Sequence, residues 1–330
     1  MLQAEDIEKQ LFQIDSEAQF EALALKIFRF QYRNNPLYHR FVESLSVSPS
    51  HINHVSQIPF LPIEFFKSHI VQTGSFHPEA VFSSSGTTGM VTSKHYVKDL
   101  IIYQESMLAG FKRFFGKPSD YVILALLPSY LEREGSSLVY MSEKLIKMSK
   151  DRRSGFYLHD YQKLSQLLSQ LKKQNQKTLL IGVTYALLDL AEQYPIHFPE
   201  LILMETGGMK GKRKELVREA LHEQLKQAFG VPHVYSEYGM TELLSQAYSK
   251  GEGIFGTPPW MKIFIRDVND PLSLVAQGKS GGINVVDLAN LYSCSFIATQ
   301  DLGKKISSDE FEILGRFDNS DVRGCNLLVQ

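Results

Sequence analysis

Residues 178–236 read TLLIGVTYALLDLAEQYPIHFPELILMETGGMKGKRKELVREALHEQLKQAFGVPHVYS. Short apolar runs alternate here with longer amphipathic runs, and Gly230 closes the second amphipathic run. Strands that alternate with helices of this length favour a parallel sheet covered on both faces. The pattern predicts strands at Thr178–Val183, Leu201–Glu205 and Val231–Ser236, and helices at Thr184–Tyr194 and Arg213–Phe229.

The flanking sequence extends this pattern in both directions. Upstream, Lys98–Phe115 is predicted to be a helix and Tyr121–Leu127 a buried strand. Downstream, shorter strands are expected at Ile283–Asp287 and Ser295–Ala298. We therefore expect an α/β fold with a mostly parallel sheet covered by helices on both faces and a smaller β-rich C-terminal part.

Composition excludes several classes of partner. The chain has 330 residues, with 35 basic and 36 acidic side chains and a net charge of −1, so binding to nucleic acid or to a membrane surface is not expected. Its two cysteines and the absence of a signal-like N-terminus indicate a reducing, cytoplasmic compartment. The longest apolar run is far shorter than the roughly 20 residues of a membrane span.

Phosphate-binding chemistry is indicated first by a serine- and threonine-rich segment. Residues 82–90 read FSSSGTTGM and are followed by Lys94. Two glycines let backbone N–H groups turn inward as an anion nest, while hydroxyls and the lysine add donors and positive charge. A mobile polar loop is the alternative, and the spacing differs from that of a P-loop. The predicted donors are Ser83, Ser84, Ser85, Gly86, Thr87, Thr88, Gly89 and Lys94.

Of three further motifs, the first comes directly off a predicted strand, the second ends a predicted strand and the third lies around a predicted turn; parallel sheets bind ligands at the carboxyl ends of their strands. In YSEYGMTE (235–242), Tyr238 beside Gly239 suits a purine face, Thr241 a phosphate and Glu242 a divalent cation. In TQDLG (299–303) and GRFD (315–318), Asp301 suits ribose hydroxyls and Arg316 a phosphate or ribose. Each motif by itself is equally compatible with an ordinary polar loop.

Two other patterns do not support a site. The sequence GEGIFG (251–256) matches a dinucleotide fingerprint, but Pro258 and Pro259 prevent the helix that would hold a pyrophosphate. His51 and His54 lack a third metal ligand at a recognisable spacing, so a solvated turn is the better interpretation.

Taken together, the four polar motifs in this order resemble the core motifs of the adenylate-forming superfamily. Within it, the chain looks most like the LuxE-type acyl-protein synthetases, which are related to phenylacetate-CoA ligases. The closer features are IPFLPIEFFK (58–67), LPSYLER (127–133), GSSLVY (135–140) and VRGCNL (322–327). The resemblance implies the N-terminal domain of the adenylate-forming fold at 58–312, after a helical segment at 1–57 and before a short C-terminal tail at 313–330.

The resemblance also implies a reaction and a set of roles. A carboxylic acid, with a fatty acid expected, would attack ATP to give acyl-AMP and pyrophosphate, and a thiol would then take the acyl group. Residues 83–89 with Lys94 would hold phosphates, Tyr238 would flank adenine, and Glu242 would bind Mg²⁺. Asp301 would hold ribose. Gly207 and Gly208 occupy a place that in this family lies against the nucleotide.

The chain departs from the family pattern at two points. Gln300 stands where the family usually has glycine, which is expected to alter a turn more than the chemistry. The chain also ends about 12 residues after Asp318, so a full C-terminal lid with its lysine is not expected. Either a local cation or a partner protein would substitute for this lysine, or activity would be slow. The candidate cations are Lys94, Arg133, Lys210 and Arg323.

A cysteine near the C-terminus is the expected acyl acceptor. Cys325 follows Arg323, which would favour its thiolate, and chain ends are usually loosely held. In LuxE-type enzymes such a cysteine passes the acyl group to a reductase partner. A structural role for Cys325 is the alternative, and Cys294 is expected to be buried. The candidate acyl pocket residues are Tyr130, Ser136, Ser137, Tyr140 and Met141.

Two other functions remain open at this point. One is an acyl- or aryl-CoA ligase of the phenylacetate type, which would use a soluble thiol. The other is a non-catalytic nucleotide- or acyl-binding subunit that retains the site without the lid.

Overall fold

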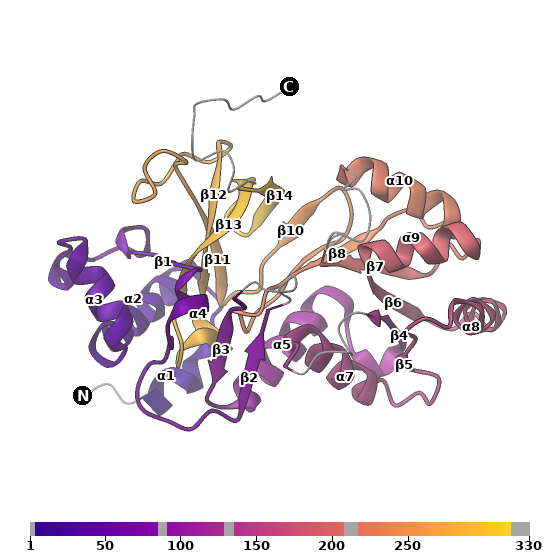
Figure 1. Cartoon of the computed structure of the whole chain (residues 1–330), viewed down its shortest axis with the longest axis horizontal. Helices are drawn as coiled ribbons and strands as arrows, with labels where there is room; N and C mark the ends of the chain where they lie inside the picture. Colours follow the sequence, from indigo (N-terminus) through magenta and orange to yellow (C-terminus); the bar gives the residue numbers. More distant parts are fainter. Residues whose placement is uncertain (1–3, 85–90, 129–134, 208–216, 318–330) are drawn as a thin grey trace.

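The structure is a computed structural model that describes residues 4–84, 91–128, 135–207 and 217–317. Twelve strands within these residues form one large mixed sheet, and helices cover it on both faces (Figure 1). None of the described helices combines the length and the apolar character that crossing a bilayer requires.

One half of the sheet is parallel, as predicted. Its order is β5 (Gly155–Phe156), β4 (Val122–Leu126), β6 (Thr178–Val183), β7 (Ile202–Thr206) and β8 (Tyr235–Tyr238). Every residue of β4 and β6 is buried, as the continuous apolar runs of strands covered on both faces require. β8 starts four residues later than predicted, after Pro232, which has no N–H to donate to a ladder.

The other half of the sheet is antiparallel. Its strands follow β8 in the order β9 (Ala247–Ser249), β10 (Ile254–Gly256), β14 (Glu310–Arg316), β13 (Phe296–Lys305), β12 (Ser280–Asp287) and β11 (Met261–Arg266). The β-rich C-terminal part thus continues the same sheet. β13 is much longer than the predicted Ser295–Ala298, because its polar residues pair with strands on both sides. The predicted domain boundary between residues 312 and 313 falls within β14. This domain division stays a prediction.

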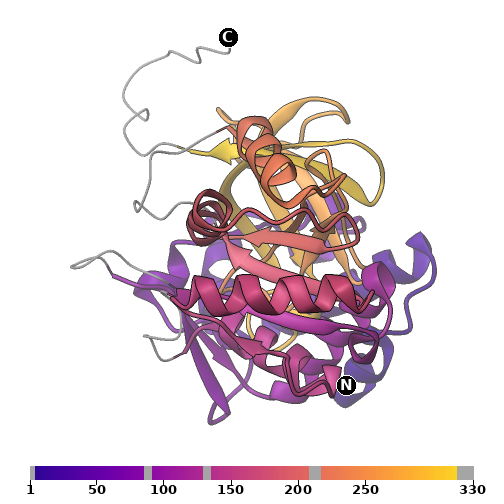
Figure 2. The same ribbon diagram turned by 90° about the vertical axis from the view of Figure 1, so that its right-hand side faces the viewer.

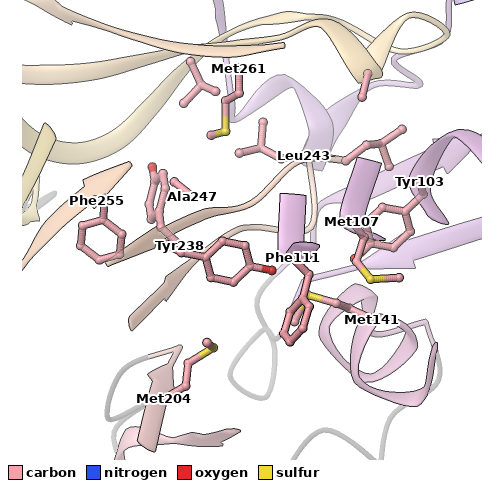
Figure 3. Packing of buried hydrophobic residues seen from close by; sticks show 14 of the residues in the cluster. Tyr103, Met107, Phe111, Met141, Met204, Tyr238, Leu243, Ala247, Phe255 and Met261 are labelled. Atoms are coloured by element: carbon pink, nitrogen blue, oxygen red, sulfur yellow. The ribbon is translucent and has the colours of Figure 1, made fainter. Parts of the chain in front are cut away.

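Helices pack on both faces of the parallel half. α5 (Leu100–Phe115) and α7 (Ser137–Ser149) lie on one face, and α9 (Thr184–Gln193) and α10 (Arg218–Phe229) lie on the other (Figures 1 and 2). α8 (Tyr161–Lys173) lies against α9. Side chains of α5 and α7, including Met107, Phe111 and Met141, pack toward the strands (Figure 3). Burying each such side chain contributes about 1.5–3 kcal/mol.

The N-terminal segment packs on the antiparallel half. It contains α1 (Ala4–Leu11), α2 (Glu17–Asn34), α3 (Pro36–Ser44) and the 3-10 turns Pro49–His51 and Val55–Gln57. The Gln31 side chain on α2 donates to the carbonyl of Asn290 at 2.9 Å and accepts from the N–H of Ser295 at 3.0 Å. These bonds satisfy buried backbone groups near η4 (Leu288–Asn290).

A short connecting region then leads to a separate hairpin. β1 (Leu61–Pro62) pairs in parallel with β13, and α4 (Phe65–Ser68) follows it. β2 (Ala80–Ser83) and β3 (Lys94–Val97) form a two-stranded antiparallel sheet. η3 (Pro118–Asp120) precedes β4.

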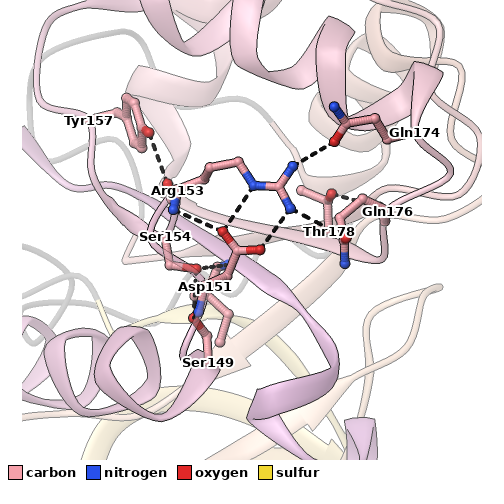
Figure 4. Close-up of polar contacts among 9 residues, drawn as sticks. Ser149, Asp151, Arg153, Ser154, Tyr157, Gln174, Gln176 and Thr178 are labelled. Atoms are coloured by element: carbon pink, nitrogen blue, oxygen red, sulfur yellow. Dashed lines mark hydrogen bonds and ion pairs between the residues drawn. The ribbon is translucent and has the colours of Figure 1, made fainter.

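An ion pair secures the outer edge of the parallel half. The Arg153 guanidinium donates to both oxygens of Asp151, at 2.9 and 2.7 Å, and to Gln174 at 2.6 Å (Figure 4). Its hydrogen bonds and charge lower the pKa of Asp151. The network joins the turn before β5 to the end of α8.

Candidate active site

Three of the predicted motifs meet on the sheet. The Tyr238 hydroxyl at the end of β8 donates to Asp301 Oδ2 at 2.8 Å, although the two residues are 63 positions apart. Arg316 Nε lies 3.4 Å from Asp301 Oδ1, and the two residues are register partners on β14 and β13. The predicted adenine, ribose and phosphate contacts therefore come from one small region.

Asp301 is already engaged on both oxygens. Burial raises the pKa of its carboxyl, while the Tyr238 hydrogen bond and the charges of Arg316 and Arg266 act in the opposite direction. Asp301 can bind two ribose hydroxyls only if Tyr238 and Arg316 move away from its oxygens. The Arg316 side chain is 73% exposed and can move without losing buried packing. The binding of ribose by Asp301 stays a prediction, and it requires this rearrangement of Tyr238 and Arg316.

Tyr238 is buried rather than displayed. Its ring packs edge-on against Phe255 and Phe311, with centroid distances of 6.1 and 5.6 Å. Burial also raises the pKa of its hydroxyl well above the usual value, so the group stays protonated and can donate. Tyr238 can stack on adenine only if its ring moves or if Phe255 and Phe311 move away from it. This role also stays a prediction.

The loop after β8 is held by groups that sequence reasoning missed. His95 Nδ1 on β3 lies 2.8 Å from the carbonyl of Thr241, and Asn290 Nδ2 donates to the carbonyl of Glu242 at 2.7 Å. Burial lowers the pKa of His95 to about 4, so its ring is neutral. The Asp287 carboxylate accepts from two backbone N–H groups of the same loop, at 2.8 and 3.0 Å.

Glu242 is a buried carboxylate, with 5% of the residue exposed. Burial raises its pKa, while a hydrogen bond from Ser93 and the charges of Lys67 and Arg316 oppose that effect. A desolvated oxygen ligand suits Mg²⁺, which proteins usually hold through one or two carboxylates together with substrate phosphates. Within the described ranges no group of three His, Cys, Asp or Glu could hold a metal alone. Glu242 therefore fits a cation shared with phosphate oxygens.

The β2–β3 hairpin brings the start and end of the predicted phosphate loop together. Ser83 and Lys94 are cross-strand partners, and the Lys94 side chain is exposed. The backbone of Ser84 donates to the carbonyl of Ser93 at 3.1 Å, and the Ser84 hydroxyl accepts from the N–H of Ser93 at 2.9 Å. The remaining predicted donors, Ser85, Gly86, Thr87, Thr88 and Gly89, lie outside the described residues.

Two glycines lie at the ends of neighbouring strands. Gly207 follows β7 with a φ of +75°, in the left-handed region that favours glycine, and it is exposed. Gly239 follows β8 in the loop described above. Gly208 lies outside the described residues.

The unusual Gln300 has a structural partner. Its amide donates to the Glu64 carboxylate, and its side-chain oxygen lies 3.5 Å from Arg316 Nη2. Because β1 pairs with β13, the IPFLPIEFFK segment lies directly beside the TQDLG motif. The substitution of the family's glycine thus adds a tie between these two motifs.

The other predictions are resolved as follows. Cys294 is fully buried, as expected, and burial raises its pKa to about 12. The GEGIFG segment forms a turn and strand β10, which confirms that it opens no helix.

Tyr140 and Met141 lie on α7, where the Tyr140 ring stacks on Tyr103 with centroids 5.5 Å apart. Cys325, Arg323, Arg133, Lys210 and Tyr130 lie outside the described residues.

Solved structures share this fold. The structure of 2-hydroxyisobutyryl-CoA ligase in an open conformation with 2-HIB-AMP and CoA superposes with a TM-score of 0.64 at 14% identity, covering 93% of this chain and 72% of the ligase. ATP-bound MatB from Rhodopseudomonas palustris gives a TM-score of 0.53 at 19% identity, covering 72% of this chain and 48% of MatB. The fold is therefore that of the adenylate-forming ligases.

A family profile makes the assignment more specific. The profile of the LuxE acyl-protein synthetases matches residues 7–330. The chain belongs to this family. No curated protein sequence matches it.

Proposed function

We propose that this protein activates a carboxylic acid, with a fatty acid as the preferred substrate, and transfers the acyl group to a protein thiol. Membership of the acyl-protein synthetase family supports both steps. The observation that carries the proposal is the joining of Tyr238, Asp301 and Arg316 at the edge of the loop that contains Glu242.

In the first step, an oxygen of the substrate carboxylate attacks the α-phosphorus of ATP. The bond from the α-phosphorus to the bridging oxygen breaks, and acyl-AMP and pyrophosphate form. Lys94 and the hydroxyls near Ser83 would neutralise phosphate charge, and Thr241 would donate to a phosphate oxygen. Glu242 would hold Mg²⁺, which supplies charge neutralisation at the phosphates. Catalysis of this kind consists mainly of positioning and electrostatic stabilisation.

In the second step, a thiolate attacks the acyl carbon and AMP leaves. Cys325 is the proposed first acceptor, and a reductase partner is the proposed final one. The thioester that forms keeps the acyl group at an activated carbonyl, so a partner can reduce or transfer it.

The decisive experiment measures exchange of labelled pyrophosphate into ATP with a panel of carboxylic acids. Acid-dependent exchange that requires Mg²⁺ is the expected result. Labelled acid should then become bound to the protein through a hydroxylamine-sensitive bond. Absence of exchange with every acid, while ATP still binds, would refute the enzymatic assignment and favour a binding subunit.

A second candidate is a CoA ligase. It is favoured by the fold shared with 2-hydroxyisobutyryl-CoA ligase, whose structure contains CoA. The product distinguishes the two candidates: acyl-CoA released into solution indicates the ligase, and covalently labelled protein indicates the synthetase.

A further inference from the structure

Glu237 lies near the end of β8 and beside the end of β7, close to Gly207 and Gly239, which follow these two strands. It is the register partner of Thr206, so the ends of β7 and β8 are side by side at this point. The Thr206 hydroxyl donates to Glu237 Oε2 at 2.5 Å. The other oxygen, Oε1, lies only 2.3 Å from the position that a Cβ on Gly239 would occupy. One carboxyl group therefore contacts Thr206, which precedes Gly207, and lies against Gly239, which follows Tyr238.

The surroundings of Glu237 favour its neutral form. The pKa of this carboxyl is raised to about 7, mainly by burial and further by the charge of Glu205, although the Thr206 hydrogen bond acts in the opposite direction. Among the described residues, Tyr103 on α5 and Tyr248 on β9 also interact with it, besides Glu205 on β7. Burial keeps both phenols protonated by raising their pKa values. None of these groups supplies a positive charge.

We propose that Glu237 is a positioning residue that joins the end of β7 to the start of the loop after β8 and holds Gly207 and Gly239 in place for the nucleotide. This inference rests on the proposed function. In the neutral form the carboxyl makes these contacts without adding charge. In the ionised form it places a negative charge beside Thr206 and Gly239, next to residues predicted to contact the nucleotide, and ATP is itself an anion. Binding of ATP should therefore weaken as Glu237 loses its proton.

The test uses pyrophosphate exchange with the full chain, with the KM for ATP measured from pH 6 to pH 8. For the wild type, the KM for ATP is expected to rise as the pH increases through about 7. Glu237→Gln keeps the shape and the hydrogen-bond acceptor, so its KM at pH 6 should stay within about twofold of the wild type and should not rise with pH. Glu237→Leu should raise this KM about tenfold, the factor expected when one hydrogen bond is lost.

Thr206→Val provides an independent probe, because it removes the hydroxyl that donates to Glu237. Its KM for ATP should rise several-fold. Thr178→Val is the matched control: Thr178 is a buried threonine at the other end of the neighbouring strand, and its hydroxyl donates to a carbonyl at 2.8 Å. Urea unfolding of all variants separates loss of fold from loss of positioning.

The outcomes separate this inference from the proposed function. If the wild type exchanges pyrophosphate but its KM for ATP does not change with pH, or if Glu237→Leu leaves that KM unchanged, the positioning role is wrong. An equal effect of Thr178→Val would also contradict it. If the wild type shows no exchange with any acid, the proposed function itself fails.

Discussion

Replacing Asp287 with alanine should both destabilise the protein and loosen the loop that contains Glu242. The Asp287 carboxylate is fully buried and accepts from the N–H groups of Leu244, Ser245 and Ala289, at 2.8, 3.0 and 3.1 Å. The Ser245 hydroxyl donates to it as well, at 2.5 Å. Alanine leaves three buried N–H donors without an acceptor.

The size of the effect follows from these donors. Each buried donor left unpaired costs about 1–3 kcal/mol, so the three together predict a loss of about 3 kcal/mol or more from the free energy of unfolding. Asp287→Asn keeps one acceptor oxygen but turns an N–H₂ group toward the remaining donors, so its loss should be smaller but still measurable.

Urea unfolding, followed by circular dichroism, measures the stability, and pyrophosphate exchange measures the site. The matched control is Asp151→Ala, which removes a partly exposed carboxylate from the network in Figure 4. That variant should lose about 1 kcal/mol or less and keep its exchange rate. A free energy of unfolding for Asp287→Ala within 1 kcal/mol of the wild type would show that the buried donors find other partners, and the reasoning would be wrong.

Three further predictions concern the thiol, the metal and pH. Cys325→Ser should abolish the hydroxylamine-sensitive acyl label while pyrophosphate exchange continues, whereas Cys294→Ser should keep the label; a label retained in Cys325→Ser would exclude that acceptor. Glu242→Gln should raise the Mg²⁺ concentration needed for half-maximal exchange about tenfold, because a charged oxygen ligand becomes neutral; an unchanged Mg²⁺ dependence would remove Glu242 from the metal site. The raised pKa of Glu237, about 7 against 4.5, means that its contribution to stability is complete below pH 4.5 and is lost as the pH rises to 7. The free energy of unfolding of the wild type should therefore fall by about 3 kcal/mol relative to that of Glu237→Gln across this range, and parallel pH curves would contradict the raised pKa.

The parallel half of the sheet was predictable because its signals are local. The bounds of β6 agree with the predicted strand, and those of α9 agree to within one residue. The six-residue run at Thr178–Val183 is mostly apolar and predicts a strand that is buried on both faces. The amphipathic run that follows predicts a helix that is buried on one face. The predicted β13 was too short for the opposite reason. Its second half is polar, and only pairing with β12 and β14 makes it a strand.

The candidate site likewise contains residues that local sequence patterns reveal and residues that they do not. The motifs around Tyr238, Glu242, Asp301 and Arg316 were visible because several polar residues and glycines cluster within a few positions. The residues that hold these motifs were not visible. His95 is a single polar residue, 146 positions from the carbonyl that it holds, and nothing in the local pattern distinguishes it.

The sequence alone therefore determined the class of fold, the candidate motifs and the family that they resemble, because each of these is written in short-range patterns of burial and turn chemistry. Only the tertiary structure decided that the Tyr238 ring is buried, that both oxygens of Asp301 are occupied, and that Glu237 accepts a hydrogen bond from Thr206 on the neighbouring strand. These features depend on which strands become neighbours. Strand pairing is set by packing over the whole sheet, and no short segment records it.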